Sequence, residues 1–93
     1  MIIYVSAGNS DDKLSQYLWA HFTSEIEASL EEHGKLHGAW FSRPDSEFQN
    51  ACWCVEFDNP GEASYCHGFL TGLRDTYRQD SIAWTRVEET EFI

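Results

Sequence analysis

The chain has 93 residues, of which 42% are hydrophobic and 15% aromatic, and its 16 Asp and Glu against 6 Lys and Arg give a formal net charge of −10. This length fits one domain spanning 1–93, and the aromatic content argues against a disordered acidic tail. A charge of this sign repels nucleic acid and anionic membranes and attracts basic proteins. The apolar runs are shorter than the roughly 20 residues that cross a bilayer, and the first residues do not resemble a signal peptide. Three cysteines, an odd number, favour a reducing compartment. We therefore expect a cytoplasmic protein.

The first half of the chain predicts a strand, a long helix and a second strand. Residues 2–7 are mostly β-branched or aromatic, which is typical of a strand. We expect the helix to be capped by Asn9 or Ser10, to carry two aspartates in its first turn and to run to about His33. Apolar residues recur there every four positions, as on one face of an amphipathic helix. A second strand is expected at 35–42.

The second half of the chain predicts a strand, a helix and a final strand. Residues 51–57 are apolar at every odd position, and such an alternation indicates a half-buried strand. Asn59 followed by Pro60 favours a helix start, since asparagine caps helices and proline suits the first helical position. This helix is expected to end near Gln79, and a last strand is expected at 82–87.

The predicted element order is β-α-β-β-α-β, which places the chain in the α+β class. Two β-α-β halves with right-handed crossovers give a four-stranded antiparallel sheet in the order 4-1-3-2, with both helices on one face. This sandwich resembles the ferredoxin-like fold along the whole chain. The fold hosts many unrelated functions, so the resemblance by itself implies an architecture and no activity.

The face of the sheet that the helices leave open is the first candidate site. We expect it to hold several aromatic and polar side chains, which makes it larger than scattered surface hydrophobes explain. A homodimer, a protein partner or stacked RNA bases could cover it, and the charge of −10 speaks against RNA. The candidate interface residues on this face are Tyr4, His37, Cys52, Cys54 and Trp84.

The second candidate site is an acidic stretch of the first predicted helix. It contains Glu25, Glu27, Glu31 and Glu32, with no Lys or Arg from Leu14 to Gly34. A solvated surface explains such charges simply. A sharper interpretation is that they bind a basic protein, in the way that nucleic-acid phosphates would.

Motifs for catalysis or metal binding are weak in this sequence. Cys52 and Cys54 lie two apart on a strand, while Cys66 is predicted on the opposite side of the sheet, so the cysteines do not form a zinc site. We therefore predict no catalytic residue, no metal and no cofactor. The glycines of Gly68-x-x-x-Gly72 are expected to let the second helix pack closely against the sheet or the first helix.

These observations favour a small, acidic, non-enzymatic protein-interaction module that forms a homodimer and acts on a protein partner with a basic surface. Small acidic domains of this kind resemble phage-encoded inhibitors, including nucleic-acid mimics. One alternative is a dimeric α+β barrel that binds a small molecule, or acts as an enzyme, through the open sheet face. Another is a purely structural subunit that only dimerises.

Overall fold

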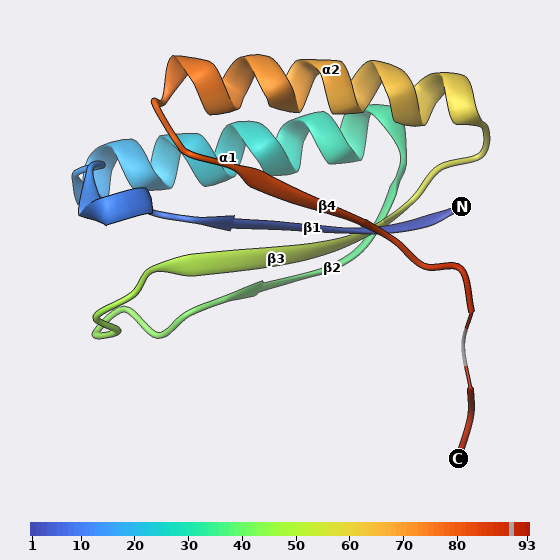
Figure 1. The fold of residues 1–93 in the computed structure, drawn as a ribbon, viewed down its shortest axis with the longest axis horizontal. Coiled ribbons are helices and arrows are strands. Elements are labelled where there is room, and N and C mark those ends of the chain that lie inside the picture. Colours follow the sequence, from blue (N-terminus) through green and yellow to red (C-terminus); the bar gives the residue numbers. More distant parts are fainter. Residues whose placement is uncertain (90) are drawn as a thin grey trace.

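The computed structural model describes residues 1–89 and 91–93 as one sheet with two α-helices and a short 3₁₀ helix, labelled η1 (Figure 1). In chain order the elements are β1 (Ile2–Gly8), η1 (Ser10–Asp12), α1 (Gln16–His33), β2 (Lys35–Phe41), β3 (Asn50–Glu56), α2 (Pro60–Thr76) and β4 (Ile82–Arg86). Apart from η1, this is the predicted order of strands and helices. Within the described residues, neither α-helix is long and apolar enough to cross a membrane.

The four strands form one antiparallel sheet in the order β2-β3-β1-β4. The central strands are β1 and β3, and both helices lie on the same side of the sheet (Figure 1). The predicted ferredoxin-like α+β architecture is therefore confirmed, including the strand order. We call the side under the helices the covered face and the other side the open face.

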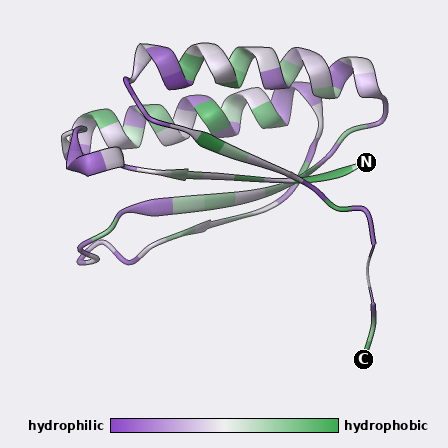
Figure 2. Ribbon diagram, in the orientation of Figure 1, coloured by the Kyte–Doolittle hydropathy of each residue, from purple (hydrophilic) through white to green (hydrophobic). Residues whose placement is uncertain are grey.

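The core lies between the covered face and the helices. Alternate residues of β1 and β3 are buried there, as the period of two requires. The helices alternate hydrophobic and hydrophilic residues along their length and turn one stripe of each toward the sheet (Figure 2). The largest fully buried side chains of this core are Trp53, Phe22, Phe57, Ile3, Ile26, Leu30, Val5, Val55 and Cys66.

Helix α1 begins later than predicted. The expected cap at Asn9 or Ser10 is wrong, because Ser15 is the N-cap and its hydroxyl accepts a hydrogen bond from the backbone N–H of Leu18 at 3.2 Å. The side chain of Asn9 instead accepts from the N–H and donates to the C=O of Leu14, both at 2.9 Å. These bonds close a loop whose two aspartates have positive φ angles, so the chain cannot continue as a helix there.

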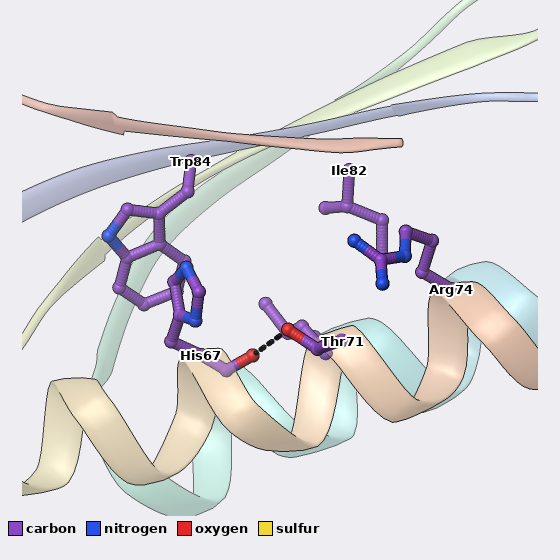
Figure 3. A pocket seen from close by; sticks show the side chains of 6 residues that line it. His67, Thr71, Arg74, Ile82 and Trp84 are labelled. Atoms are coloured by element: carbon purple, nitrogen blue, oxygen red, sulfur yellow. Dashed lines mark hydrogen bonds between the residues drawn. The ribbon is translucent and has the colours of Figure 1, made fainter. Parts of the chain in front are cut away.

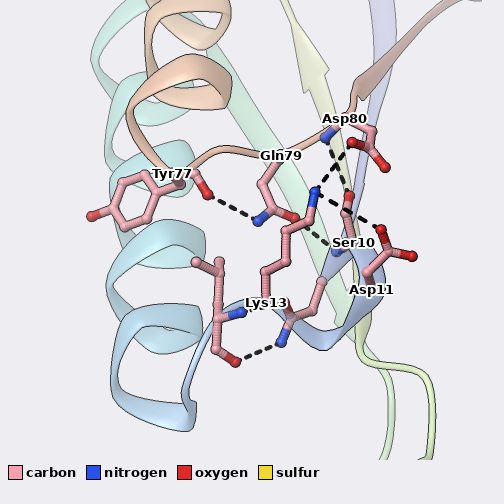
Figure 4. A network of polar contacts seen from close by, with 8 residues as sticks. Ser10, Asp11, Lys13, Tyr77, Gln79 and Asp80 are labelled. Atoms are coloured by element: carbon pink, nitrogen blue, oxygen red, sulfur yellow. Dashed lines mark hydrogen bonds and ion pairs between the residues drawn. The ribbon is translucent and has the colours of Figure 1, made fainter.

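A polar network ties this loop to the segment between α2 and β4 (Figure 4). The backbone N–H of Ser10 donates to the side chain of Gln79 at 2.8 Å, and Gln79 in turn donates to the carbonyl of Tyr77 at 3.0 Å. Lys13 forms an ion pair with Asp80 at 3.4 Å. The Gln79 side chain is buried, and its oxygen and nitrogen are both hydrogen-bonded, so it holds together two loops far apart in sequence.

Helix α2 begins where the sequence predicts. The Asn59 side chain accepts a hydrogen bond from the N–H of Glu62 at 2.9 Å, and Pro60 occupies the first turn. The close packing predicted for Gly68 and Gly72 is wrong, since a Cβ added at either position would meet nothing within 4 Å. The close approach is at Gly34, where an added Cβ would lie 2.7 Å from the carbonyl oxygen of Glu56.

Candidate functional site

The open face is built from alternate residues of all four strands. Directly opposed residues of antiparallel strands project from the same face, so the register fixes its membership. Tyr4 pairs with Cys54 and with Thr85, and Cys52 pairs with both Ser6 and Trp40. The described residues of this face are Ile2, Tyr4, Ser6, Gly8, Lys35, His37, Gly38, Trp40, Asn50, Cys52, Cys54, Glu56, Ala83 and Thr85.

The structure brings four of the five predicted sheet-face residues together and separates the fifth. Tyr4, Cys52 and Cys54 lie on β1 and β3 of the open face, and His37 reaches it from β2. The placement of Trp84 on this face is wrong, because Trp84 pairs with Val5 and therefore faces the helices. The alternative of a small-molecule pocket on the open face included Trp84 among its lining residues, and Trp84 does not lie on that face.

The centre of the open face holds a cross-strand pair of polar groups. Ser6 donates a hydrogen bond from its hydroxyl to Sγ of Cys52 at 3.4 Å. Hydrogen bonding to Cys54 raises the pKa of Tyr4 above its ordinary value, and the charge of the Cys54 thiolate would act in the same direction. Tyr4 therefore remains a neutral hydroxyl at physiological pH.

His37 and Glu56 form a polar pair near one end of the face. A bulge between Leu36 and Gly38 shifts the register of β2, and Nε2 of His37 lies 2.9 Å from Oε1 of Glu56. The hydrogen bond from His37 lowers the pKa of Glu56. A lowered carboxyl pKa stabilises the fold at neutral pH, and this contribution is lost as the pH falls through the folded-state pKa.

Trp40 supplies the largest exposed ring of the open face. Its indole lies over Gly38, where an added Cβ would be 2.9 Å from the ring, so the glycine leaves room for the ring beside the strand. The exposed fraction is 57% for Trp40 and 38% for Tyr4. The neighbouring Phe41 lies on the covered face, since it pairs with Ala51 and packs edge-on against Trp53.

The four glutamates of α1 do not form one acidic face. Residues two apart on an α-helix differ by about 200° around its axis, so Glu25 and Glu27 point to opposite edges. Glu25 accepts a hydrogen bond from the Tyr77 hydroxyl at 2.6 Å, and this bond raises the pKa of Tyr77 to about 12. Glu27 accepts one from the indole N–H of Trp53 at 3.0 Å. Both carboxylates therefore support packing.

Glu31 and Glu32 are exposed at the C-terminal end of α1, and Glu25 is exposed beside Tyr77. Glu32 lies 3.9 Å from Nε2 of His33, whose other ring nitrogen lies 3.1 Å from Glu62 on α2. The middle of the solvent side of α1 carries uncharged residues. This exposed set is Tyr17, Ala20, His21, Ser24 and Ala28.

The three cysteines are separated by the sheet. Cys66 lies in the core beneath α2, with its Sγ 3.5 Å from the Ser29 hydroxyl, while Cys52 and Cys54 project from the open face. Burial raises the pKa of the Cys66 thiol. Among the described residues, no three His, Cys, Asp or Glu side chains gather as a metal site.

Known proteins resemble this chain in their fold, at low sequence identity. No model of a known protein family matches the chain, and no curated protein matches it. The chain is similar to the crystal structure of a dimeric ferredoxin-like protein from an uncultured marine organism, at 18% identity and a TM-score of 0.51 over 99% of this chain and 90% of that one. It is also similar to an uncharacterized NIPSNAP domain protein from Burkholderia xenovorans, at 8% identity and a TM-score of 0.49 over 100% of this chain and 98% of that one.

Proposed function

We propose that this chain is a non-enzymatic interaction module that forms a homodimer through its open face and uses its acidic surface to bind a basic protein. The observation that carries the proposal is the open face itself. Both helices cover the other side of the sheet, and the exposed rings of Tyr4 and Trp40 remain on this one. A group of aromatic side chains on an uncovered sheet is typical of a surface that binds protein.

A second copy of the chain suits this face because four of its polar side chains already have partners within one chain. Ser6 bonds to Cys52, and His37 bonds to Glu56, both within one chain. Burying polar groups costs little when they are hydrogen-bonded, so two open faces can meet without leaving these groups unsatisfied. The marine ferredoxin-like neighbour is described as dimeric, which supports a homodimer for this chain as well.

The charge of the chain supports a basic partner for the dimer. The excess of 16 acidic over 6 basic residues gives the surface a negative field that attracts Lys- and Arg-rich proteins. Inhibition of a nucleic-acid-binding protein is one form that such binding could take. Ion pairs inside the chain already engage three basic side chains: Lys13 with Asp11 and Asp80, Arg43 with Asp45, and Arg74 with Asp75.

A reducing cellular compartment fits the same proposal. All three cysteines are free thiols in the structure, and free thiols are typical of the cytoplasm. On this ground we propose a cytoplasmic location for the module.

Sedimentation equilibrium tests the homodimer. The wild-type chain should show twice its single-chain mass of 10.7 kDa, and Trp40→Ala should shift the equilibrium toward the monomer by at least tenfold in dissociation constant. Phe48→Ala is the matched control, because Phe48 is 74% exposed but lies in the loop between β2 and β3. A monomeric wild-type chain, or equal effects of the two variants, would contradict the proposal.

A pair of charge variants tests the basic partner. Glu31→Gln with Glu32→Gln removes two charges from the end of α1, and Glu88→Gln with Glu89→Gln removes two from the segment after β4. Binding to a lysine-rich peptide of fixed length should weaken more in the first variant and should lose part of its salt dependence. Equal weakening in both variants would show that α1 has no special role in binding.

A further inference from the structure

A groove between α2 and the edge strand β4 lies on the covered side of the sheet, away from the open face. Two adjoining hollows of about 70 Å³ and 310 Å³ make up the groove, and they share His67 and Trp84 as a common wall. The larger hollow, which Arg86 lines, falls at the lower end of the range of small-molecule sites, about 300–1,000 Å³, and the smaller hollow, which Arg74 lines, extends it. Figure 3 shows the smaller hollow, which is lined by His67, Leu70, Thr71, Arg74, Ile82 and Trp84.

The apolar wall of this groove is held rigidly. Trp84 stacks on the buried ring of Phe57 with a centroid distance of 5.8 Å, and His67 packs edge-on against Trp84 at 5.0 Å. Leu70 and Ile82 extend the apolar surface within the smaller hollow (Figure 3). A flat ring could lie against such a wall without displacing the core.

The groove is lined by two arginines, although the chain as a whole is acidic. Arg74 lines the smaller hollow and Arg86 the larger one, and among the described residues no Asp or Glu lines either hollow. The chain as a whole has 16 Asp and Glu against 6 Lys and Arg, so this concentration of arginine is a local feature. Its position beside an aromatic wall points to a ligand with a negative charge and a ring.

Arg74 has the geometry to hold a carboxylate. Its side chain is 38% exposed and lies beneath Ile82 (Figure 3). Nε donates to Oδ1 of the exposed Asp75 at 3.0 Å. A guanidinium has five N–H donors, so the two terminal nitrogens remain for a ligand. The hydroxyl proton of Thr71 is already donated to the carbonyl of His67 at 3.0 Å, so the donor available for a carboxylate in this hollow is Arg74.

We propose that the groove between α2 and β4 binds a small aromatic carboxylate, with its ring against Trp84 and its carboxylate on Arg74. The ring replaces water on the apolar wall, and the guanidinium pairs with the carboxylate in a partly buried place. This site does not depend on the open face, so it holds whether or not the chain dimerises.

Titration of the full chain with benzoate, followed by proton–nitrogen NMR, tests the site. The indole N–H resonance of Trp84, identified by its loss in Trp84→Phe, should shift in a saturable way with a dissociation constant below about 1 mM. Benzamide keeps the ring without the charge, and acetate keeps the charge without the ring. Each should bind at least tenfold more weakly than benzoate.

Three variants locate the carboxylate. Arg74→Gln should weaken benzoate binding at least tenfold, whereas Arg43→Gln, in the hairpin loop, should leave it unchanged. Asp75→Asn removes the competing carboxylate and should tighten binding severalfold, which keeps the test valid if Arg74→Gln fails to fold. The proposal is overturned by an unsaturable shift, by benzamide binding as well as benzoate, or by Asp75→Asn having no effect.

Discussion

The two faces of the sheet are made by the same strands but have different chemistry. On the covered face, Val5 and Trp53 are fully buried against the helices. One position away along the same strands, Tyr4 is 38% exposed and Cys52 is half-buried. The open face keeps polar groups that bond to one another, whereas the covered face is almost entirely apolar. The difference shows that the core needs one face only, which leaves the other free for binding.

Two tryptophans that belong to neighbouring strands give the largest expected contrast between the faces. Trp53→Ala should lower the free energy of unfolding by about 3–5 kcal/mol, because it leaves a cavity and removes the donor to Glu27. Trp40→Ala should change it by less than about 0.5 kcal/mol in the monomer, since Trp40 is 57% exposed. Urea unfolding measures both at a protein concentration where the chain is monomeric. Similar losses in the two variants would contradict the assignment of the faces.

Gly34 and Gly72 extend the comparison between packed and solvent-exposed surface, because Gly34 lies against the backbone of β3 and Gly72 has no neighbour within 4 Å. Gly34→Ala should destabilise the fold by about 1–3 kcal/mol, since the new Cβ would lie 2.7 Å from a backbone oxygen of β3. Gly72→Ala should stabilise it by up to about 1 kcal/mol, because alanine favours a helix and nothing lies within 4 Å. Thermal unfolding of the two variants checks the opposite signs. A destabilised Gly72→Ala variant would show that α2 packs against something at that point.

The contact between Glu25 and Tyr77 joins α1 to the end of α2, above the covered face. The pKa of Tyr77 is raised to about 12, so this contact contributes its full stability below the ordinary value near 10 and loses it as the pH rises from 10 toward 12. Glu25→Gln should return the pKa of Tyr77 toward 10. The ultraviolet absorbance of phenolate, with Tyr77→Phe subtracted, measures the change. An unchanged titration in Glu25→Gln would contradict the contact.

The smallest expected difference is between Cys66 and Cys52, and it concerns only the rates at which a thiol reagent modifies them. Cys66 is fully buried and burial raises its pKa, so a thiol reagent should modify it only as slowly as the fold opens. Cys52 on the open face is half-buried and should react first at a protein concentration where the chain is monomeric. Mass mapping of the modified sites over time shows the order. Reaction of Cys66 before Cys52 would contradict the placement of the two thiols.

The fold could be predicted because its signals are local. The alternation of β3 over residues 51–57 and the Asn59–Pro60 start of α2 each depend on neighbouring residues, and both predictions are confirmed. The start of α1 was missed because Asn9 bonds to Leu14 rather than capping a helix. Asparagine suits both roles, and only the positive φ angles of the next two aspartates distinguish them.

The candidate site was predictable in part, because its composition depends on register. Four of its five residues were placed correctly, but Trp84 was not, since the face of β4 is set by pairing with Val5 on a distant strand. The apolar alternation of Ile82 and Trp84 was the signal that could have placed them beneath the helices. The division of the α1 glutamates between two edges follows from helical spacing, but their partners Tyr77 and Trp53 come from other elements.

Intermolecular contacts measured by NMR in a mixture of isotope-labelled and unlabelled chain test the central claim most directly. If the open face forms the homodimer, contacts between chains should involve the rings of Tyr4 and Trp40. Contacts between chains that involve only the exposed rings of α2, Tyr65 and Phe69, or no contacts at a concentration where sedimentation shows a dimer, would contradict it.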